Sequence, residues 1–185
     1  MSDGSKTQNS ITYGWVCGTD DGTIYAEHSG SGYGTLTSHR AEAWGMLSAL
    51  LFLQQFRSYT YSPSSAPPHT IAAFSDNSGL ITRIRKRGEY KTSYPNATLD
   101  PDWDIVEHIH STAASLHPCP VSFHWVQGHQ DDSTDELSID ALYNVRADLL
   151  ASEHQTSPFH HNASTQWLLP AEKCRLNLSN RGIYG

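Results

Sequence analysis

Residues 70–77, Thr70-Ile71-Ala72-Ala73-Phe74-Ser75-Asp76-Asn77, place an acidic residue directly after a short apolar run. An apolar run of this length between polar residues predicts a buried strand. The residues that follow, to about Lys86, predict a helix. Asp76 therefore stands where a strand ends, a common place for functional residues in α/β sheets. It could equally cap the helix that follows it.

Further elements are predicted on both sides of this stretch. Upstream, alternating apolar residues predict strands over residues 11–17 and 23–27, joined by a turn at Asp20-Asp21-Gly22, and then a helix over residues 38–56. A Gly/Ser-rich stretch, residues 29–34, separates the hairpin from this helix, and residues 58–69, with three prolines, predict a loop. Downstream, helices are predicted over about residues 100–116 and 138–154, with a strand over residues 121–126 between them. Strands that alternate with helices indicate an α/β domain with parallel pairing in one half, and the hairpin indicates antiparallel pairing in the other.

The composition fits one domain, which we place at residues 1–154, followed by a tail or linker at residues 155–185. The tail has no clear period and no evident end signal, so we expect the chain to be part of something longer. The N-terminus is polar and no apolar run approaches the roughly 18–20 residues that span a bilayer. Cys17, Cys119 and Cys174 lack metal-ligand spacing, which favours free thiols and an intracellular protein, cytoplasmic or nuclear.

The net charge of −7 argues against a general nucleic-acid-binding surface, but the cationic residues are not evenly spread. Five of the twelve Lys and Arg residues fall between positions 83 and 91. Such a cluster can hold phosphates while the rest of the surface stays acidic. The alternative is a solvated helix end. The cluster comprises Arg83, Arg85, Lys86, Arg87 and Lys91.

Acidic residues also occur on apolar helix faces. The face that carries Glu42 continues through Met46, Ala49 and Leu53, and Asp148 shares its face with other buried-type residues. Ionised carboxylates are rarely buried unless they are paired or bind a metal. Each acid has an ordinary alternative, as a helix-dipole partner, a cap or an ion-pair member. Together they indicate a site for divalent cations such as Mg²⁺, which prefers carboxylates, water and phosphate oxygens.

Six motifs, in order and with compatible spacing over residues 3–154, resemble the ribonuclease H family, most of all the domains that follow retroelement reverse transcriptases. The motifs are Asp3-Gly4-Ser5, Tyr13-Gly14-Trp15, Ser38-His39-Arg40-Ala41-Glu42-Ala43-Trp44-Gly45, Ser75-Asp76-Asn77, Trp125-Val126-Gln127-Gly128-His129-Gln130-Asp131 and Asn144-Val145-Arg146-Ala147-Asp148-Leu149-Leu150-Ala151.

The resemblance implies a five-stranded mixed sheet flanked by helices. It implies two Mg²⁺ ions, with Mn²⁺ as a substitute, held by Asp3, Glu42, Asp76 and Asp148, with His129 assisting proton transfer or product release. It also implies hydrolysis of the RNA strand of RNA–DNA hybrids by two-metal-ion catalysis, with 5′-phosphate and 3′-hydroxyl ends, and an attached reverse transcriptase. The substrate-binding candidates are Gly4, Ser5, Asn77, Arg83, Arg85, Lys86 and Arg87.

The sequence departs from the family in two places. Only Met1 and Ser2 precede Asp3, so the first strand is short and the rigidity of Asp3 is in question. Gln127 replaces a lysine that many relatives place before Gly-His, so one phosphate-binding charge is missing. We expect weak, salt-sensitive hybrid binding, with the basic cluster compensating in part.

Three rival interpretations remain. The first is a catalytically inactive ribonuclease H-like module with a structural or tethering role, although all four carboxylates are present. The second is a nuclease of the same fold class, such as an integrase, which would lack the Gly-His loop. The third is a plain binding module, which does not explain acids on apolar helix faces.

Overall fold

The computed structural model describes residues 1–60, 70–92, 99–128, 130 and 137–156. The element order confirms the predicted alternation of strands and helices. The elements are β1 (Ser2–Lys6), β2 (Ile11–Gly18), β3 (Ile24–Ser31), α1 (Ser38–Thr60), β4 (Ile71–Ser75), α2 (Ser78–Gly88), α3 (Trp103–Ser115), β5 (Val121–Trp125) and α4 (Ile139–Thr156).

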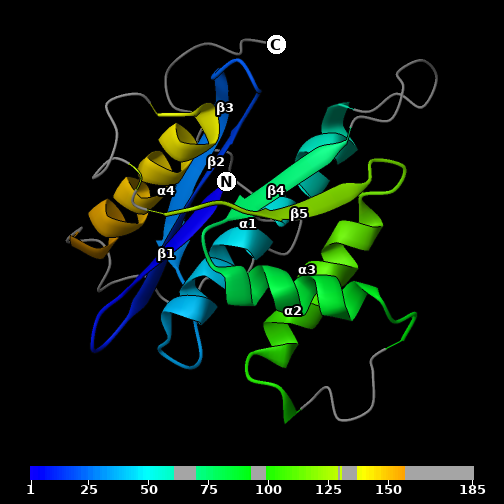
Figure 1. Ribbon diagram of the computed structural model, residues 1–185, viewed down its shortest axis with the longest axis horizontal. Helices are drawn as coiled ribbons and strands as arrows, with labels where there is room; N and C mark the ends of the chain where they lie inside the picture. The colour runs from blue at the N-terminus through cyan, green and yellow to red at the C-terminus, as the bar shows by residue number, and fades with distance from the viewer. Residues whose placement is uncertain (61–69, 93–98, 129, 131–136, 157–185) are drawn as a thin grey trace.

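The strands form one mixed sheet in the order β3-β2-β1-β4-β5 (Figure 1). The β1, β2 and β3 strands pair antiparallel, whereas β4 is parallel to both β1 and β5. The expected α/β fold with a five-stranded mixed sheet is therefore confirmed. The short first strand is formed, and it pairs with β2 over five positions but with β4 at one, Ser2 opposite Ser75.

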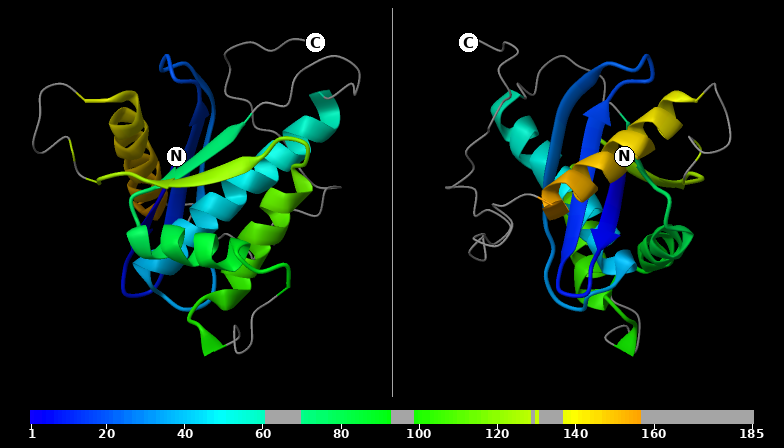
Figure 2. Two further views of the ribbon diagram at one scale, coloured as in Figure 1. Left: turned by 45° about the vertical axis from the view of Figure 1, so that its right-hand side comes forward. Right: turned by 90° about the vertical axis from the view of Figure 1, so that its left-hand side faces the viewer.

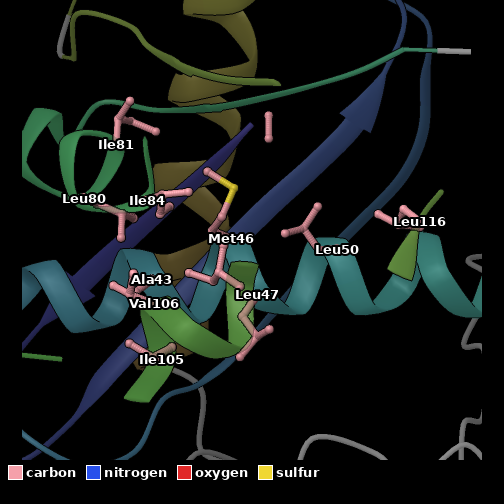
Figure 3. Packing of buried hydrophobic residues seen from close by; sticks show 12 residues of the cluster. Ala43, Met46, Leu47, Leu50, Leu80, Ile81, Ile84, Ile105, Val106 and Leu116 are labelled. Carbon is pink, nitrogen blue, oxygen red and sulfur yellow. The ribbon is translucent and has the colours of Figure 1, made fainter. Parts of the chain in front are cut away.

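The helices cover the two faces of the sheet unequally. The α4 helix lies across β1 and β2 on one face, while α1 lies behind the same strands on the other (Figure 2). The α1, α2 and α3 helices pack together on their side and share one hydrophobic core, which Figure 3 shows around Met46, Leu50 and Ile84. The α1 helix is apolar on several sides because it is enclosed between the sheet and α3.

Two close approaches of helix to strand depend on glycine. A Cβ on Gly4 would lie 2.6 Å from the Ala41 carbonyl carbon, and one on Gly45 would lie 3.2 Å from the main-chain carbonyl oxygen of Asp3. These two glycines let α1 touch β1. On the opposite face, a Cβ on Gly14 would overlap the Ala147 carbonyl and lie 2.8 Å from Leu150 Cβ. Gly14 thus lets α4 rest directly on β2.

Some boundaries differ from the sequence-based ones. The β3 strand continues through Ser31, so the first part of the expected Gly/Ser-rich separator is strand, because Ser29 and Ser31 pair with Gly14 and Thr12 on β2. The α1 helix runs to Thr60, beyond the predicted end at residue 56. The α4 helix runs to Thr156 and so crosses the domain boundary proposed after residue 154, while residues 157–185 lie outside the described residues.

The α3 helix begins at Trp103, and the residue before it, Asp102, makes no side-chain cap hydrogen bond. Asp102 has a left-handed backbone (φ 59°), and its carboxylate contacts His39 at 3.2 Å and Arg40 at 2.9 Å instead of capping α3. Arg40 also pairs with Asp104 at 2.6 Å. The N-terminal ends of α1 and α3 are therefore joined by an ion-pair network in which Arg40 and Asp102 are largely buried and Asp104 is exposed.

The remaining sequence expectations concern cysteines and membranes. Cys17 and Cys119 are free thiols, and Cys174 lies outside the described residues. None of the described helices combines the length and the apolar character that crossing a bilayer requires.

Candidate metal centre

Three carboxylates from three different elements meet at one point of the sheet. Asp3 of β1, Glu42 of α1 and Asp76, directly after β4, each offer an oxygen atom, and these atoms lie within 4.8 Å of one another. Asp3 and Glu42 are buried, with exposed fractions of 7% and 6%. The structure thus brings together three of the four carboxylates named as metal ligands.

The parallel pairing of β1 with β4 places the two aspartates side by side. Ser2 is paired with Ser75, so the next residue on each strand, Asp3 and Asp76, follows in the same direction. The strands share that one pair, and beyond it β4 ends whereas β1 continues to Lys6. The carboxylates therefore gather where the two central parallel strands separate, which is where ligands bind in α/β sheets.

Glu42 reaches the aspartates because α1 lies in direct contact with β1. A side chain at Gly4 would collide with the Ala41–Glu42 backbone, and one at Gly45 would press against Ser2 and Asp3. A larger residue at either position would push the helix, and Glu42 with it, away from the strand. The polar N-terminal part of the buried α1 helix is thereby fixed against the end of the sheet.

Both oxygens of the Glu42 carboxylate accept hydrogen bonds. The Ser75 hydroxyl donates to Oε2 at 2.8 Å, and the Asn77 amide donates to Oε1 at 3.1 Å. Burial raises the pKa of Glu42 to about 8, with the nearby charges of Asp76 and Asp3 acting in the same direction and the two hydrogen bonds opposing them. Gathering carboxylates in this way is unfavourable unless a proton or a cation compensates.

The residues around Asp76 come from β5 and the segment after it. The indole N–H of Trp125 donates to the Asp76 main-chain carbonyl at 2.8 Å. Gly128 lies so close that a Cβ there would overlap Asp76 Oδ2. His129, the expected proton-transfer residue, follows Gly128 in the chain but lies outside the described residues.

Asp148 comes from α4, on the opposite face of the sheet from α1. Asp3 is paired with Gly14, and directly opposed residues of an antiparallel pair point to the same face. Because α4 lies against Gly14 through Ala147, the Asp3 side chain and the segment that carries Asp148 share that face. Asp148 is partly buried and does not belong to the three-carboxylate group defined by the 4.8 Å limit.

Two solved structures are similar to this chain in fold. The chain is similar to ribonuclease H1 from the halophilic archaeon Halobacterium salinarum NRC-1, with a TM-score of 0.56 and 22% identity, over 83% of this chain and 93% of that one. It is also similar to LC11-RNase H1 in complex with an RNA/DNA hybrid, with a TM-score of 0.56 and 19% identity, over 82% and 91%. The chain has a ribonuclease H fold. Neither the family models nor the curated proteins gave a match.

Within this ribonuclease H fold, three substrate-binding candidates have partners inside the protein. Gly4 packs against α1, and its N–H donates to Asp3 Oδ1 at 2.6 Å. The Ser5 hydroxyl donates to Gln155 Oε1 at 3.2 Å. Asn77 caps α2 and donates to Glu42, so it is placed to support a metal ligand.

The basic cluster on α2 divides into buried and exposed members. Arg87 is 6% exposed, and its guanidinium pairs with Glu107 and donates to the Tyr90 carbonyl, which does not fit a phosphate-binding role. Arg83 donates to the Pro101 carbonyl at 2.8 Å, and Arg85 donates to the Phe123 carbonyl at 2.6 Å. Lys86 is exposed on the same helix.

Sequence reasoning gave no role to Ser75, Trp125 or Gly128, although each belongs to a quoted motif. Ser75 is fully buried, and a hydroxyl at the end of an apolar strand was the signal that could have identified it. The contacts of Trp125 and Gly128 with Asp76 depend on the pairing of β4 with β5, which links residues about 50 positions apart and leaves no local trace in the sequence.

Proposed function

We propose that this chain is a divalent-metal-dependent endonuclease that hydrolyses the RNA strand of RNA–DNA hybrids. The observation that carries the proposal is the meeting of Asp3, Glu42 and Asp76 within 4.8 Å, from three elements of a ribonuclease H fold. The similar LC11-RNase H1 binds an RNA/DNA hybrid, and this supports the hybrid as the proposed substrate.

The donor set fits Mg²⁺, with Mn²⁺ as a substitute. Each ligand is a carboxylate oxygen, and three carboxylates this close together are not all ionised at neutral pH unless a cation compensates their charge. We propose two ions, with Asp148 as the fourth ligand residue, on the α4 side of Asp3. When bound, such ions activate water and stabilise the charge that develops on the scissile phosphate.

In the proposed reaction, the protein holds the carboxylate ligands and orients them towards the cations. Asp3 and Asp76 extend from adjacent strands, so their separation is set by the backbone pairing of the sheet. Glu42 is fixed by two hydrogen bonds. We propose that His129 accepts or delivers a proton near the leaving group, so that the products carry 5′-phosphate and 3′-hydroxyl ends.

The exposed part of the basic helix α2, Lys86 above all, is the proposed contact for phosphates of the hybrid. With a net charge of −7 on the whole chain, binding rests on few cations. We therefore propose weak binding that declines steeply with added salt. The proposal includes a linked reverse transcriptase domain from a retroelement, which would add affinity for the hybrid. It also includes an intracellular location.

The test is cleavage of a labelled RNA–DNA hybrid in Mg²⁺, beside single-stranded RNA, duplex RNA and duplex DNA. We expect cleavage of the RNA strand of the hybrid alone, abolished by chelator and by Asp76→Asn. A folded protein that cleaves none of these in Mg²⁺ or Mn²⁺ would favour the second candidate, an inactive ribonuclease H-like module. Cleavage of duplex DNA would point to a different nuclease.

A further inference from the structure

The Glu42 carboxylate is held from two sides by residues that are not metal ligands themselves. We propose that Ser75 and Asn77 are positioning residues that fix this carboxylate in the orientation required for metal binding. Ser75 donates to Oε2 at 2.8 Å and Asn77 to Oε1 at 3.1 Å. The inference rests on the proposed function, because it takes Glu42 to be a metal ligand.

Asn77 performs two tasks with one amide. Its Oδ1 accepts from the Leu80 N–H at 3.0 Å, which caps α2, so its NH₂ group must be the one that faces Glu42. A serine at this position would still cap the helix but would be too short to bridge to Glu42. An aspartate would also cap but would turn a negative oxygen towards a carboxylate. The side chain at position 77 can therefore be changed without losing the helix cap.

A second hydrogen-bonded connection between Asn77 and Glu42 passes through the Ser75 hydroxyl. The Asn77 main-chain N–H donates to the Ser75 hydroxyl at 3.1 Å, and that hydroxyl in turn donates to Glu42. Ser75 is fully buried at the end of β4, next to Asp76. The orientation of Glu42 is therefore coupled to the backbone turn that carries Asp76, the ligand from the neighbouring strand.

Fixing the carboxylate in this way leaves lone pairs on both oxygens for a cation, since each oxygen accepts more than one bond. Residues that hydrogen-bond to metal ligands typically change metal affinity by about 10–100-fold when they are removed. Without Ser75 or Asn77, the flexible Glu42 side chain would have to be ordered by the cation itself. The loss should therefore appear in metal affinity before it appears in substrate binding.

The experiment is a titration of the whole chain with Mn²⁺ followed by electron paramagnetic resonance, and with Mg²⁺ by calorimetry. We expect Ser75→Ala and Asn77→Ser to weaken metal binding by about 10-fold or more, and Asn77→Asp to weaken it further. Ser75→Thr, which keeps the hydroxyl, should restore most of the affinity. In cleavage assays, the metal concentration for half-maximal rate should rise while KM for the hybrid stays nearly constant.

Ser78→Ala is the matched control, because Ser78 is exposed in the first turn of α2. Thermal unfolding identifies any variant that fails to fold, and Asn77→Ser, which retains the cap, then carries the test if Ser75→Ala is unstable. Metal affinity unchanged in folded Ser75→Ala and Asn77→Ser would overturn the inference while leaving the proposed function intact. An unaltered chain that binds neither cation would overturn both.

Discussion

Trp125 donates its indole N–H to the main-chain carbonyl of Asp76 at 2.8 Å, although 52% of the tryptophan surface is exposed. The bond runs from the end of β5 to the residue that follows β4, and so ties the loop bearing a metal-ligand candidate to the neighbouring strand. The indole N–H explains why a large aromatic side chain is exposed here, because it holds the main chain of Asp76 in place.

Trp125→Phe keeps an aromatic ring and removes the donor. We expect a loss of about 1 kcal/mol in the free energy of unfolding, and a larger relative loss of hybrid cleavage at limiting Mg²⁺ than at saturating Mg²⁺. Chemical denaturation and metal-dependent rates measure the two effects. Equal rates for both proteins at all Mg²⁺ concentrations would show that the bond does not support Asp76.

Gly128→Ala should damage the site more than the fold. The added methyl group would overlap Asp76 Oδ2, so either the carboxylate or the segment at Gly128 must move. We expect at least a tenfold loss of cleavage, which corresponds to about 1.4 kcal/mol in activation free energy, with a small change in melting temperature. Gly88→Ala is the control, because a Cβ at this helical position meets nothing within 4 Å. A Gly128→Ala protein as active as the control would contradict this geometry.

The contribution of Glu42 to the stability of the metal-free protein should fall as the pH rises from about 4.5 to about 8. Burial, together with the charges of Asp76 and Asp3, raises the pKa of Glu42 from 4.5 to about 8 in the folded protein. The folded state therefore holds its proton more tightly than the unfolded state, and this contribution is lost as the pH passes through the folded pKa.

The comparison that isolates this effect is wild type against Glu42→Gln, because histidines such as His28 and His39, whose pKa values are lowered by burial, titrate in both proteins. We expect the variant to be more stable than wild type at pH 8 and the difference to shrink towards pH 5. Mg²⁺ should stabilise wild type most at the high end of this range. A pH-independent difference would exclude the raised pKa.

The two neighbouring cations Lys86 and Arg87 should respond in different ways to neutralisation. Arg87→Met removes the ion pair of Arg87 with the partly exposed Glu107 and should lower the free energy of unfolding by about 2 kcal/mol. Lys86→Gln, at an exposed position, should lower stability much less than Arg87→Met, raise KM for the hybrid, and reduce the salt dependence of log KM by about one unit. Denaturation and steady-state kinetics at several salt concentrations separate these outcomes. An unchanged KM for Lys86→Gln at low salt would remove α2 from the proposed substrate surface.

Apolar patterns in the sequence were sufficient to predict eight of the nine described elements, whereas β1, with the sequence Ser-Asp-Gly-Ser-Lys, has no such pattern and was expected only from the family resemblance. The positions of Glu42, Asp76 and Asp148 on apolar faces or at a strand end indicated a cation site only when the three acids were taken together, and Asp3 was added by the family resemblance. The sequence could not separate Arg87 from Lys86, because the partner that buries Arg87 lies 20 residues away on another helix. The same limit applies to Asp102, which pairs with Arg40, 62 residues earlier in the chain.

Gly4, Gly14 and Gly45 lie at the contacts between helices and strands and restrict which substitutions the chain accepts there. Spacing between the carboxylate-bearing elements is set there by hydrogen atoms rather than by side chains. In a library of single substitutions selected for nuclease activity, Gly4 and Gly14 should be as intolerant as the acids themselves and Gly45 less so, because its Cβ would lie 3.2 Å from its neighbours, although none of the three could touch a substrate through a side chain.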